Sequence, residues 1–436
     1  MARADSGFQE IGRAGLRAWS GRIVEEFLPE LQGRRAVAVY REMAANDPVV
    51  GAVLFAVEMT LRGVPWSVEP AADHGAARDA AHFLDGVRDD MSHAFEDFLA
   101  EVLTMLVHGW SWFEIVWKRR LGDGPDPTRR SLHSDGRVGV RKLALRAQDT
   151  LARWELDDAG GIRGMWQEAG PNAPAPVFLP IEKSLLFRTA TAKGNPEGRS
   201  LLRNAYRPWF FKKRLEEAEA IGYWRALAGL PVARIPARFM ATTASAEEKA
   251  LYEDFKRIVR DTQVDERAGL VLPSDRDERG HPWFEFGLLS APTTQAVPIR
   301  QAIVDRSREI AMTALADFVL LGRDSAGSYA LAREKGERFE TVLAAWLDGI
   351  AAVLNRHLVP RLWRLNALPA ATMPRFRPGR VGRLDAPTLA TIVERLSGAG
   401  LPLVPDDALD RFLRAAAGLP PPSARMADQE GQDDDR

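Results

Sequence analysis

Cysteine is absent from this 436-residue chain. Without thiols, the protein can form neither a disulfide framework nor a thiolate metal site. Such a composition fits a protein that is made and used in a reducing cytoplasm. Long apolar runs are also missing, because the longest, near Val49–Val57 and Phe318–Leu321, are too short to span a bilayer. The N-terminal segment lacks the apolar core of a signal peptide, so we expect no membrane partner.

An excess of charge of either sign is missing too. The chain carries 59 basic and 60 acidic side chains, a formal net charge of -1. This balance excludes a chain-wide basic surface that grips nucleic acid, although a local basic patch remains compatible with it. The apolar share of 46% is enough for a sizeable core, and the length suits two or three domains.

Histidines in metal-ligand spacing are absent as well. His82, His93 and His108 lie in one helical region, but their spacings of 11 and 15 residues supply no i,i+4 pair. We interpret them as partly buried or surface side chains. No cofactor or metal site is predicted.

Two segments loosely resemble active-site loops. Gly109–Phe113 has the start of a nucleophile elbow without its second glycine, so we expect Ser111 to be an ordinary strand residue. Gly194–Ser200 is one residue short of a phosphate loop and has Arg199 in place of lysine. Pro196 also removes a backbone donor. We expect a turn leading into a long helix, with Ser200 as its N-cap, and no enzyme activity.

Three aromatic residues are followed directly by three basic ones at residues 209–214. Trp209, Phe210 and Phe211 stand beside Lys212, Lys213 and Arg214. Such interleaving can bind nucleic acid. We favour the other interpretation, in which the aromatic side chains are core and their basic neighbours form the solvated face.

Local signals in residues 46–190 favour a mixed α and antiparallel β region. Asp47 and Pro48 predict a helix start, and Gly63 ends that helix. A short strand over 65–70, helices at about 76–90 and 94–107, and a strand over 110–117 follow. Asp158–Gly161 predicts a hairpin turn.

The pattern becomes more helical after residue 200. A long helix over 200–228, interrupted early by Pro208, leads to strands at 230–235, 270–272 and 283–286 around a helix at 245–261. A helix over 297–318, a Gly/Ser loop, and a long helix kinked at Pro360 come next. Residues 383–420 read as two or three short helices. The fold class is α+β.

This order of elements resembles the portal protein family of bacteriophages, in particular its Mu-like group. The resemblance covers roughly residues 45–425, and no single motif carries it. The similar segments are Asp47–Val53, Val64–Val68, the Gly-x-Pro-x-Gly-x-Ser turn of Gly194–Leu202, Tyr206–Lys213, Gly327–Glu334, the helix-closing Asn366, and Leu401–Pro405 to Gly418–Pro420.

The resemblance implies a portal fold with a mixed wing domain, a helical stem, a small α/β clip, a long wing helix and a short helical crown. The implied parts are an N-terminal segment (1–45), the wing (46–199), the first stem helix (200–230), the clip (231–292), the second stem helix (293–318), the tunnel loop (319–330), the long wing helix (331–366), the crown (367–425) and a disordered tail (426–436).

It also implies a function and partners. Subunits of this family form a homo-oligomeric ring, usually a dodecamer, at one vertex of the capsid. Double-stranded DNA passes through the ring during packaging and ejection without sequence specificity. The expected protein partners are the large terminase, the head–tail adaptor, and the major capsid or scaffold protein. The expected location is the capsid vertex of the virion, and the bacterial host cytoplasm during assembly.

We place the channel constriction in the tunnel loop, whose glycines and serines suit movement against passing DNA. Arg323 and Asp324 are candidate channel-facing charges. The candidate residues are Leu321, Gly322, Arg323, Asp324, Ser325, Gly327, Ser328 and Tyr329. The alternative is a plain surface connector. For the whole chain, the alternatives are another virion structural protein (head completion or minor capsid) and an unrecognised hydrolase that depends on Ser111 or His108.

Overall fold

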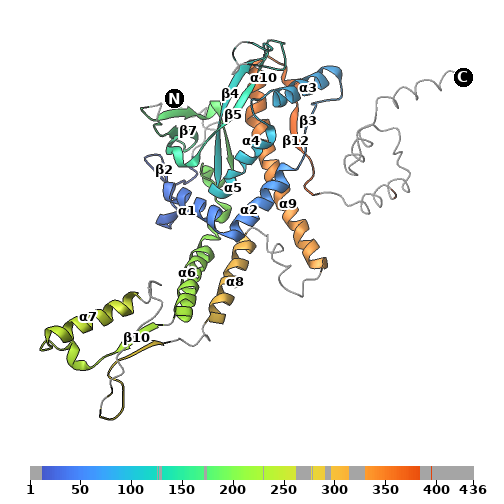
Figure 1. Cartoon of the computed structure of the whole chain (residues 1–436). Coiled ribbons are helices and arrows are strands. Elements are labelled where there is room, and N and C mark those ends of the chain that lie inside the picture. Colours follow the sequence, from blue (N-terminus) through green and yellow to red (C-terminus); the bar gives the residue numbers. More distant parts are fainter. Residues whose placement is uncertain are drawn as a thin grey trace. The chain divides into compact units, whose positions relative to one another are not determined.

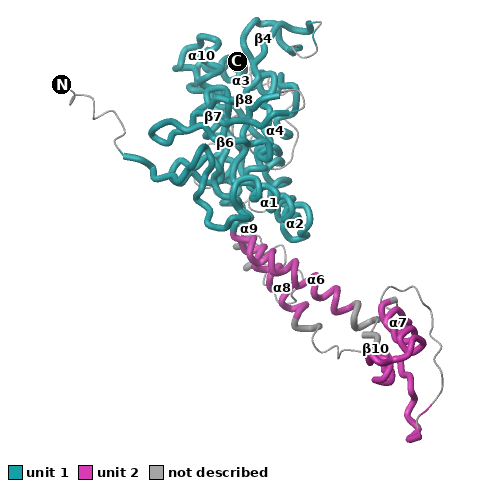
Figure 2. The backbone as a smooth tube through the Cα atoms, turned by 90° about the vertical axis from the view of Figure 1, so that its left-hand side faces the viewer, with its two compact units in different colours: residues 1–203, 321–436 teal, residues 204–320 magenta. Residues whose placement is uncertain are grey.

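The computed structural model consists of two compact units (Figures 1 and 2). One unit contains residues 1–203 and 321–436, and the other contains residues 204–320. The second unit is therefore an insertion within the first. The structure describes residues 12–124, 126, 130–170, 174–228, 230–261, 276, 278–289, 296–313, 329–382 and 394.

The first unit mixes helices and antiparallel strands, as the sequence predicts. In chain order its elements are β1 (Ala18–Trp19), β2 (Arg22–Ile23), α1 (Gly33–Asn46), α2 (Pro48–Arg62), β3 (Trp66–Glu69), α3 (Gly75–Asp89), α4 (Phe95–Val102), α5 (Thr104–His108), β4 (Trp110–Arg119), β5 (Val138–Arg146), β6 (Leu151–Leu156), β7 (Ile162–Gln167), β8 (Val177–Pro180), β9 (Ser184–Arg188), α9 (Tyr329–Val353), α10 (Val359–Leu365) and β12 (Arg375–Pro378). The α+β class is confirmed.

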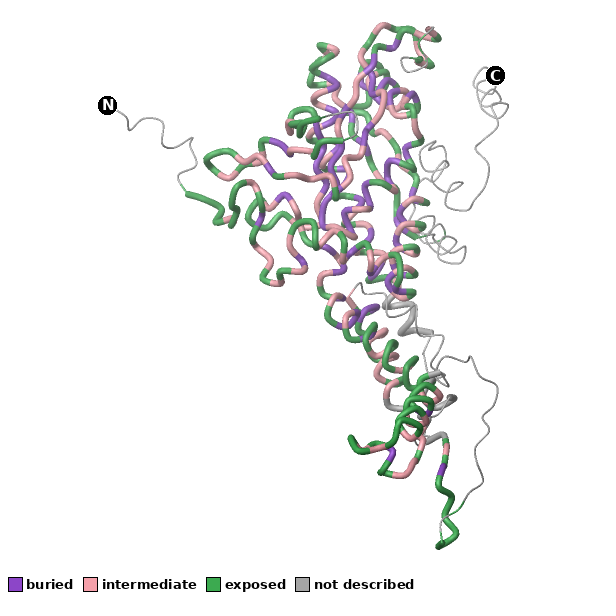
Figure 3. The backbone as a smooth tube through the Cα atoms, turned by 60° about the vertical axis from the view of Figure 1, so that its left-hand side comes forward, coloured by how far each residue is buried: buried purple, intermediate pink, exposed green. Residues whose placement is uncertain are grey.

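Strand β4 lies at the centre of this unit. It is the middle strand of an antiparallel sheet ordered β5-β4-β9. Side chains alternate between the two faces of a strand, and β4 is buried on both. Trp110 and Trp112 pack against the second antiparallel sheet, β6-β7-β8, where they meet Trp154. Phe113 points the other way and contacts Phe98 of α4 with ring centroids 5.0 Å apart. Strand β4 is thus packed on both faces, and buried residues gather in the interior of this unit (Figure 3).

Helix boundaries follow local chemistry in several places. Asp47 caps α2 by accepting hydrogen bonds from the backbone N–H groups of Val49 and Val50, at 2.9 and 3.1 Å, and Pro48 occupies the first helical position. The predicted cap and the helix end at Gly63 are both confirmed. The chain bends by 90° between α1 and α2 at this cap.

The predicted kink at Pro360 takes the form of a π-helical turn. Residues Leu354–Leu358 form this turn between α9 and α10. Proline lacks a backbone N–H, and its ring collides with the carbonyl four residues earlier in a regular α-helix. The wider π turn supplies the adjustment, and Pro360 then lies in the first turn of α10.

Two asparagine side chains of this helical segment form hydrogen bonds with the backbone of strands. The Asn355 side chain donates to the Phe376 carbonyl at 2.9 Å and accepts from the Phe376 N–H at 2.8 Å. Asn366 does the same with Val138, at 3.0 and 2.7 Å. Each side-chain amide therefore satisfies the N–H and the carbonyl of one strand residue, in β12 and β5 respectively, as a residue of an adjacent strand would.

Among the residues that the structure describes, the helix Gly336–Leu365 is long and apolar enough to cross a membrane by length and composition alone. One face of it is buried within the first unit, where Leu343, Leu347, Leu354 and Leu362 are nearly or fully inaccessible, while Leu365 is 51% exposed.

The second unit combines two long helices with a small strand–helix–strand module. Its elements are α6 (Tyr206–Ala228), β10 (Leu230–Arg234), α7 (Ala246–Asp261), β11 (Glu285–Leu289) and α8 (Ala296–Thr313). Strands β10 and β11 pair antiparallel, so α6 ends and α8 begins at the same end of the unit. The two helices pack side by side (Figures 1 and 2). Phe239, Phe255 and Phe284 form the core of the module. The strand expected at 270–272 lies outside the described residues.

Three expectations need correction. The long helix begins at Tyr206 rather than at residue 200, because Pro208 is compatible only with the first turn. Ser200 instead caps a short 3-10 turn by accepting from the Leu202 N–H at 3.0 Å. The expected helix over 94–107 is broken at Leu103 into α4 and α5. Residues 375–378, placed in a helical crown, form strand β12, which pairs with β3 and so extends the first unit.

Candidate functional site

The predicted tunnel loop cannot be compared with the structure. Seven of the eight candidate residues, from Leu321 to Ser328, lie outside the described residues. Tyr329 is the first residue of α9, and its side chain is not described. The channel role of these residues stays a prediction.

The Gly194–Ser200 turn is a structural clasp. Gly198 has a left-handed backbone with φ of 57°, and a Cβ there would overlap with the carbonyl oxygen of Gly109. Gly109, with φ of 91°, faces the turn in the same way. Two backbones therefore approach so closely that only glycine fits at either position.

Hydrogen bonds fasten this clasp. Thr189 donates from its backbone to the Gly109 carbonyl at 3.0 Å, and its hydroxyl accepts from the Arg199 N–H at 3.1 Å. The Ser200 hydroxyl donates to the Val107 carbonyl at 2.5 Å. The turn is thus held against the end of α5 and the residue after β9, and the Arg199 N–H is used within the protein. This supports the structural interpretation of the motif.

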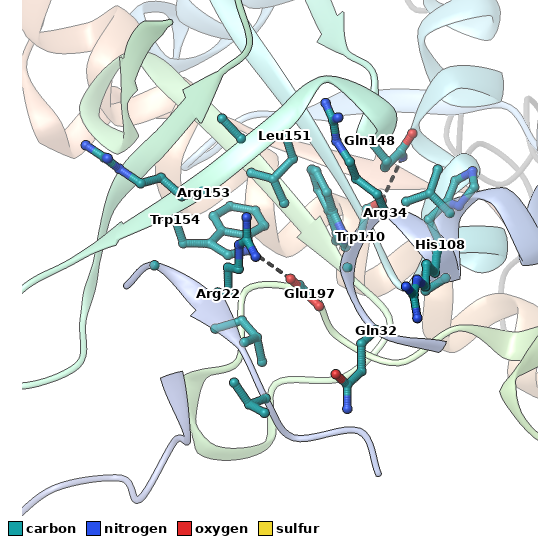
Figure 4. Close-up of a pocket in the computed structure, with 18 of the residues that line it drawn as sticks. Arg22, Gln32, Arg34, His108, Trp110, Gln148, Leu151, Arg153, Trp154 and Glu197 are labelled. Atoms are coloured by element: carbon teal, nitrogen blue, oxygen red, sulfur yellow. Dashed lines mark hydrogen bonds between the residues drawn. The ribbon is translucent and has the colours of Figure 1, made fainter. Parts of the chain in front are cut away.

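A pocket of about 490 Å³ lies beside the clasp (Figure 4). Its walls come from β2, the start of α1, β4 and β6. Trp110 and Trp154 form an aromatic wall, and Arg22, Arg34 and Arg153 bring positive charge. Arg34 forms an ion pair with Glu168, which also lines the pocket.

Glu197, in the middle of the clasp, reaches into this pocket. Its carboxylate accepts a hydrogen bond from the indole N–H of Trp154 at 3.1 Å. Burial raises the pKa of Glu197 to about 7, although the Trp154 hydrogen bond opposes this shift. The sequence pattern drew attention to the glycines of the turn and not to Glu197, because its burial depends on Trp154, 43 residues away.

The hydrolase alternative finds no support at Ser111 or His108. The Ser111 hydroxyl is fully buried and donates to the Val102 carbonyl at 3.0 Å. His108 lines the pocket, and burial lowers its pKa to about 4, with a smaller effect from Arg41. Ser111 does not line that pocket. Among the described residues, no group of three or more His, Asp or Glu could hold a metal ion.

The aromatic and basic residues of α6 form cation–π contacts within the helix. Trp209 is buried, as expected for a core side chain, but Phe211 is 44% exposed. Lys213 lies 5.7 Å from the Trp209 ring and Arg214 lies 4.5 Å from the Phe210 ring. The core interpretation therefore holds for Trp209 and is wrong for Phe211. The expected solvated face is wrong for Lys212, which is buried.

Solved structures share this architecture. A chain from the virion of a native gene transfer agent particle superposes with a TM-score of 0.50 at 14% identity, covering 88% of this chain and 94% of that chain. A chain from the neck of an empty particle of the same kind gives the same values. An HK97 family phage portal protein from Corynebacterium diphtheriae gives 0.38 at 15% identity, covering 78% and 94%. No curated protein sequence matches the chain.

The fold is that of a virion structural protein of the portal class. The family model described as the portal protein of Mu bacteriophage matches residues 37–413. The chain belongs to this family and has the function of a portal protein. The family is structural rather than enzymatic.

Proposed function

We propose that this portal protein forms a closed ring, most simply a dodecamer, at one vertex of a capsid, and that double-stranded DNA passes through it. The observation that carries the proposal is the family match over residues 37–413. Repeated head-to-tail contacts between identical subunits close into a ring when the rotation fits.

The inserted unit suits a conduit wall. Helices α6 and α8 pack antiparallel, and the strand–helix–strand module of β10, α7 and β11 lies at one end of them. We assign α6 and α8 to the stem and the strand–helix–strand module to the clip, which would dock the large terminase and later the head–tail adaptor. The first unit, as the wing, would meet the major capsid or scaffold protein.

The near-neutral chain agrees with this role. DNA must slide through the ring, and each contact with a phosphate group adds salt-dependent binding affinity that opposes sliding. We assign the narrowest point of the channel to residues 319–330. The protein would act at the capsid vertex of a virion after assembly in the host cytoplasm, in line with the particle that contains the similar chain described above.

Negative-stain microscopy of the purified chain tests the ring. We expect rings with a central hole about as wide as a duplex. A compact monomer under every assembly condition would contradict the proposal, as would a solid oligomer, which would favour a head-completion or minor capsid protein.

The loop assignment has its own test. Replacing Gly322 and Gly327 together with proline should impair DNA packaging while rings still form, because proline removes the freedom that glycine gives the loop. Alanine at both positions is the matched control with a milder expected loss. Normal packaging by the proline variant would contradict the assignment.

A further inference from the structure

A cluster of arginines lies where the long helix passes β9. Arg356 is in the π-helical turn, and Arg361 and Arg364 follow on α10. Arg188 ends β9, the edge strand that this segment packs against. Arg356 and Arg364 are exposed, whereas Arg361 is half-buried.

Backbone carbonyls hold two of these guanidinium groups in place. Arg361 donates from Nη1 to the Ser184 carbonyl at 2.6 Å and from Nη2 to the Ile181 carbonyl at 2.9 Å. Arg188 donates to the Asn195 carbonyl at 3.0 Å. A carbonyl fixes the orientation of a guanidinium without neutralising its charge, so both groups stay positive and are held rigidly.

Few carboxylates neutralise the positive charge of this cluster. Within the described part of the chain, none of the ion pairs includes Arg188, Arg356, Arg361 or Arg364. Glu182 attracts Arg361 without forming an ion pair with it. The pKa of His357 is lowered, first by burial and then by Arg361, Arg356 and Arg188. The surroundings of His357 are therefore electropositive.

Part of this cluster shares one face of the helix. His357, Arg361 and Arg364 follow one another at spacings of four and three residues, which puts them on one face. Arg356 and Arg364 are eight residues apart, about 12 Å along the axis at about 1.5 Å per residue. The π turn that accommodates Pro360 sets where Arg356 lies relative to that face, and π turns are frequent at functional sites.

We propose that this arginine stripe, Arg356, Arg361 and Arg364 with Arg188 beside them, binds the phosphate backbone of double-stranded DNA. Guanidinium groups form paired hydrogen bonds with phosphate oxygens. The length of the stripe is close to the width of the DNA major groove, about 12 Å. Its two ends can therefore meet phosphates on both sides of one groove, without reading the sequence.

The proposal rests on the proposed function to the extent that duplex DNA is the polyanion this protein meets. It adds a fixed contact on the first unit, separate from the tunnel loop. A stripe of four guanidiniums makes few phosphate contacts, so it would hold DNA weakly and reversibly at physiological salt.

Fluorescence anisotropy with a labelled 30-base-pair duplex, titrated over a series of KCl concentrations, tests the stripe. For the full chain, the slope of log K against log [KCl] should fall in magnitude by about 2 in the double variant Arg356→Gln/Arg364→Gln, since each lost phosphate contact removes about 0.9. The lysine variant Arg356→Lys/Arg364→Lys should keep most of the slope.

The matched control is Arg375→Gln/Arg380→Gln, which removes the same charge from exposed positions of the same unit. We expect its slope to equal that of the wild type. An unchanged slope in the Arg356/Arg364 variant, or an equal fall in the control, overturns the proposal. So does a variant that loses ring assembly but keeps its DNA slope, because the stripe would then dock a second copy of the chain.

Failure of the proposed function is distinguishable from failure of this inference. If the wild-type protein forms no rings but the salt slope still falls only in the Arg356/Arg364 variant, the ring proposal is wrong and the DNA-binding stripe is supported. If rings form normally but the slope does not change in the Arg356/Arg364 variant, the ring proposal is supported and the DNA-binding stripe is wrong.

Discussion

Gly194 and Gly198 belong to the same turn but have different surroundings. Both have positive φ, 69° and 57°, yet a Cβ at Gly194 meets nothing within 4 Å, whereas at Gly198 it overlaps with the Gly109 backbone. Gly198→Ala should therefore lower the free energy of unfolding by at least about 3 kcal/mol, since the clasp must shift. Gly194→Ala should cost about 1 kcal/mol, from the left-handed backbone alone. Urea unfolding of both variants measures the difference, and equal losses would show that the close approach is unimportant.

Glu197 should make the stability of the protein depend on pH. Its pKa rises from 4.5 to about 7 on folding, so the folded chain holds this proton more tightly than the unfolded chain. The resulting stabilisation is complete below the unfolded pKa and is lost as the pH rises through about 7.

The variant Glu197→Gln keeps an oxygen to accept from Trp154 but cannot ionise. Relative to this variant, we expect the wild type to lose roughly 1–3 kcal/mol of unfolding free energy between about pH 5 and 8. Parallel urea unfolding curves at several pH values measure it. A constant difference across that range would mean that Glu197 titrates as an ordinary surface carboxylate.

Single residues were predictable where their chemistry is local. Asp47 caps a helix through N–H groups two and three residues away, so its role follows from a short stretch of sequence. Glu197 and Gly109 could not be interpreted in this way. Their surroundings come from residues that are distant in the chain, and no local pattern indicates such contacts.

At the scale of elements, Asn355 and Asn366 show how the long helical segment is tied to the strands of the first unit. Asn355→Leu keeps a similar side-chain volume but leaves the N–H and carbonyl of Phe376 without partners. Leaving a buried polar group unsatisfied costs about 1–3 kcal/mol, so we expect a loss of roughly 2–4 kcal/mol. Asp348→Leu, at an exposed position of α9, is the control and should change stability by less than about 0.5 kcal/mol.

Thermal unfolding monitored by circular dichroism compares these two variants. A loss for Asn355→Leu no larger than that of the control would show that water replaces the side-chain amide at β12. Asn355→Asp separates the two hydrogen bonds, because it retains the acceptor for the Phe376 N–H and removes the donor to its carbonyl.

The helices that contain Pro208 and Pro360 were predicted correctly in part. The sequence indicated that Pro208 and Pro360 disturb helices, and both do so. It did not indicate the form of the disturbance, since Pro208 sets where α6 begins and Pro360 is accommodated by a π turn. Strand β12 was missed because four residues give little periodicity and its pairing partner, β3, lies some 300 residues earlier.

At the scale of the whole molecule, the order of elements carried the prediction. Each motif is short, but their sequence along the chain is that of a portal protein, and the family match over residues 37–413 agrees with it. The prediction of a tunnel loop at 319–330 rests on that order alone. The proposed DNA contacts at Arg356 and Arg364 have no local sequence signal, because such a site depends on which side chains from distant parts of the chain lie nearby.

The two units should also unfold as separate cooperative bodies, because each has an aromatic core of its own. Phe98 contacts Phe113 and Phe187 in the first unit, and Phe255 stacks on Phe284 at 5.6 Å in the second. Multi-domain chains commonly depart from two-state unfolding. We expect scanning calorimetry of the unassembled full chain to show two transitions, the lower one from the smaller second unit.

Core truncations assign these transitions. Phe255→Ala should destabilise the second unit by about 3–5 kcal/mol and lower the midpoint of the low-temperature transition only. Phe98→Ala, in the first unit, should lower the midpoint of the high-temperature transition only, because substitutions without shared partners act independently. If one transition is seen and both variants lower it equally, the inserted unit and the surrounding unit fold as a single body. Two independently stable units would let the inserted unit change its conformation without destabilising the first unit.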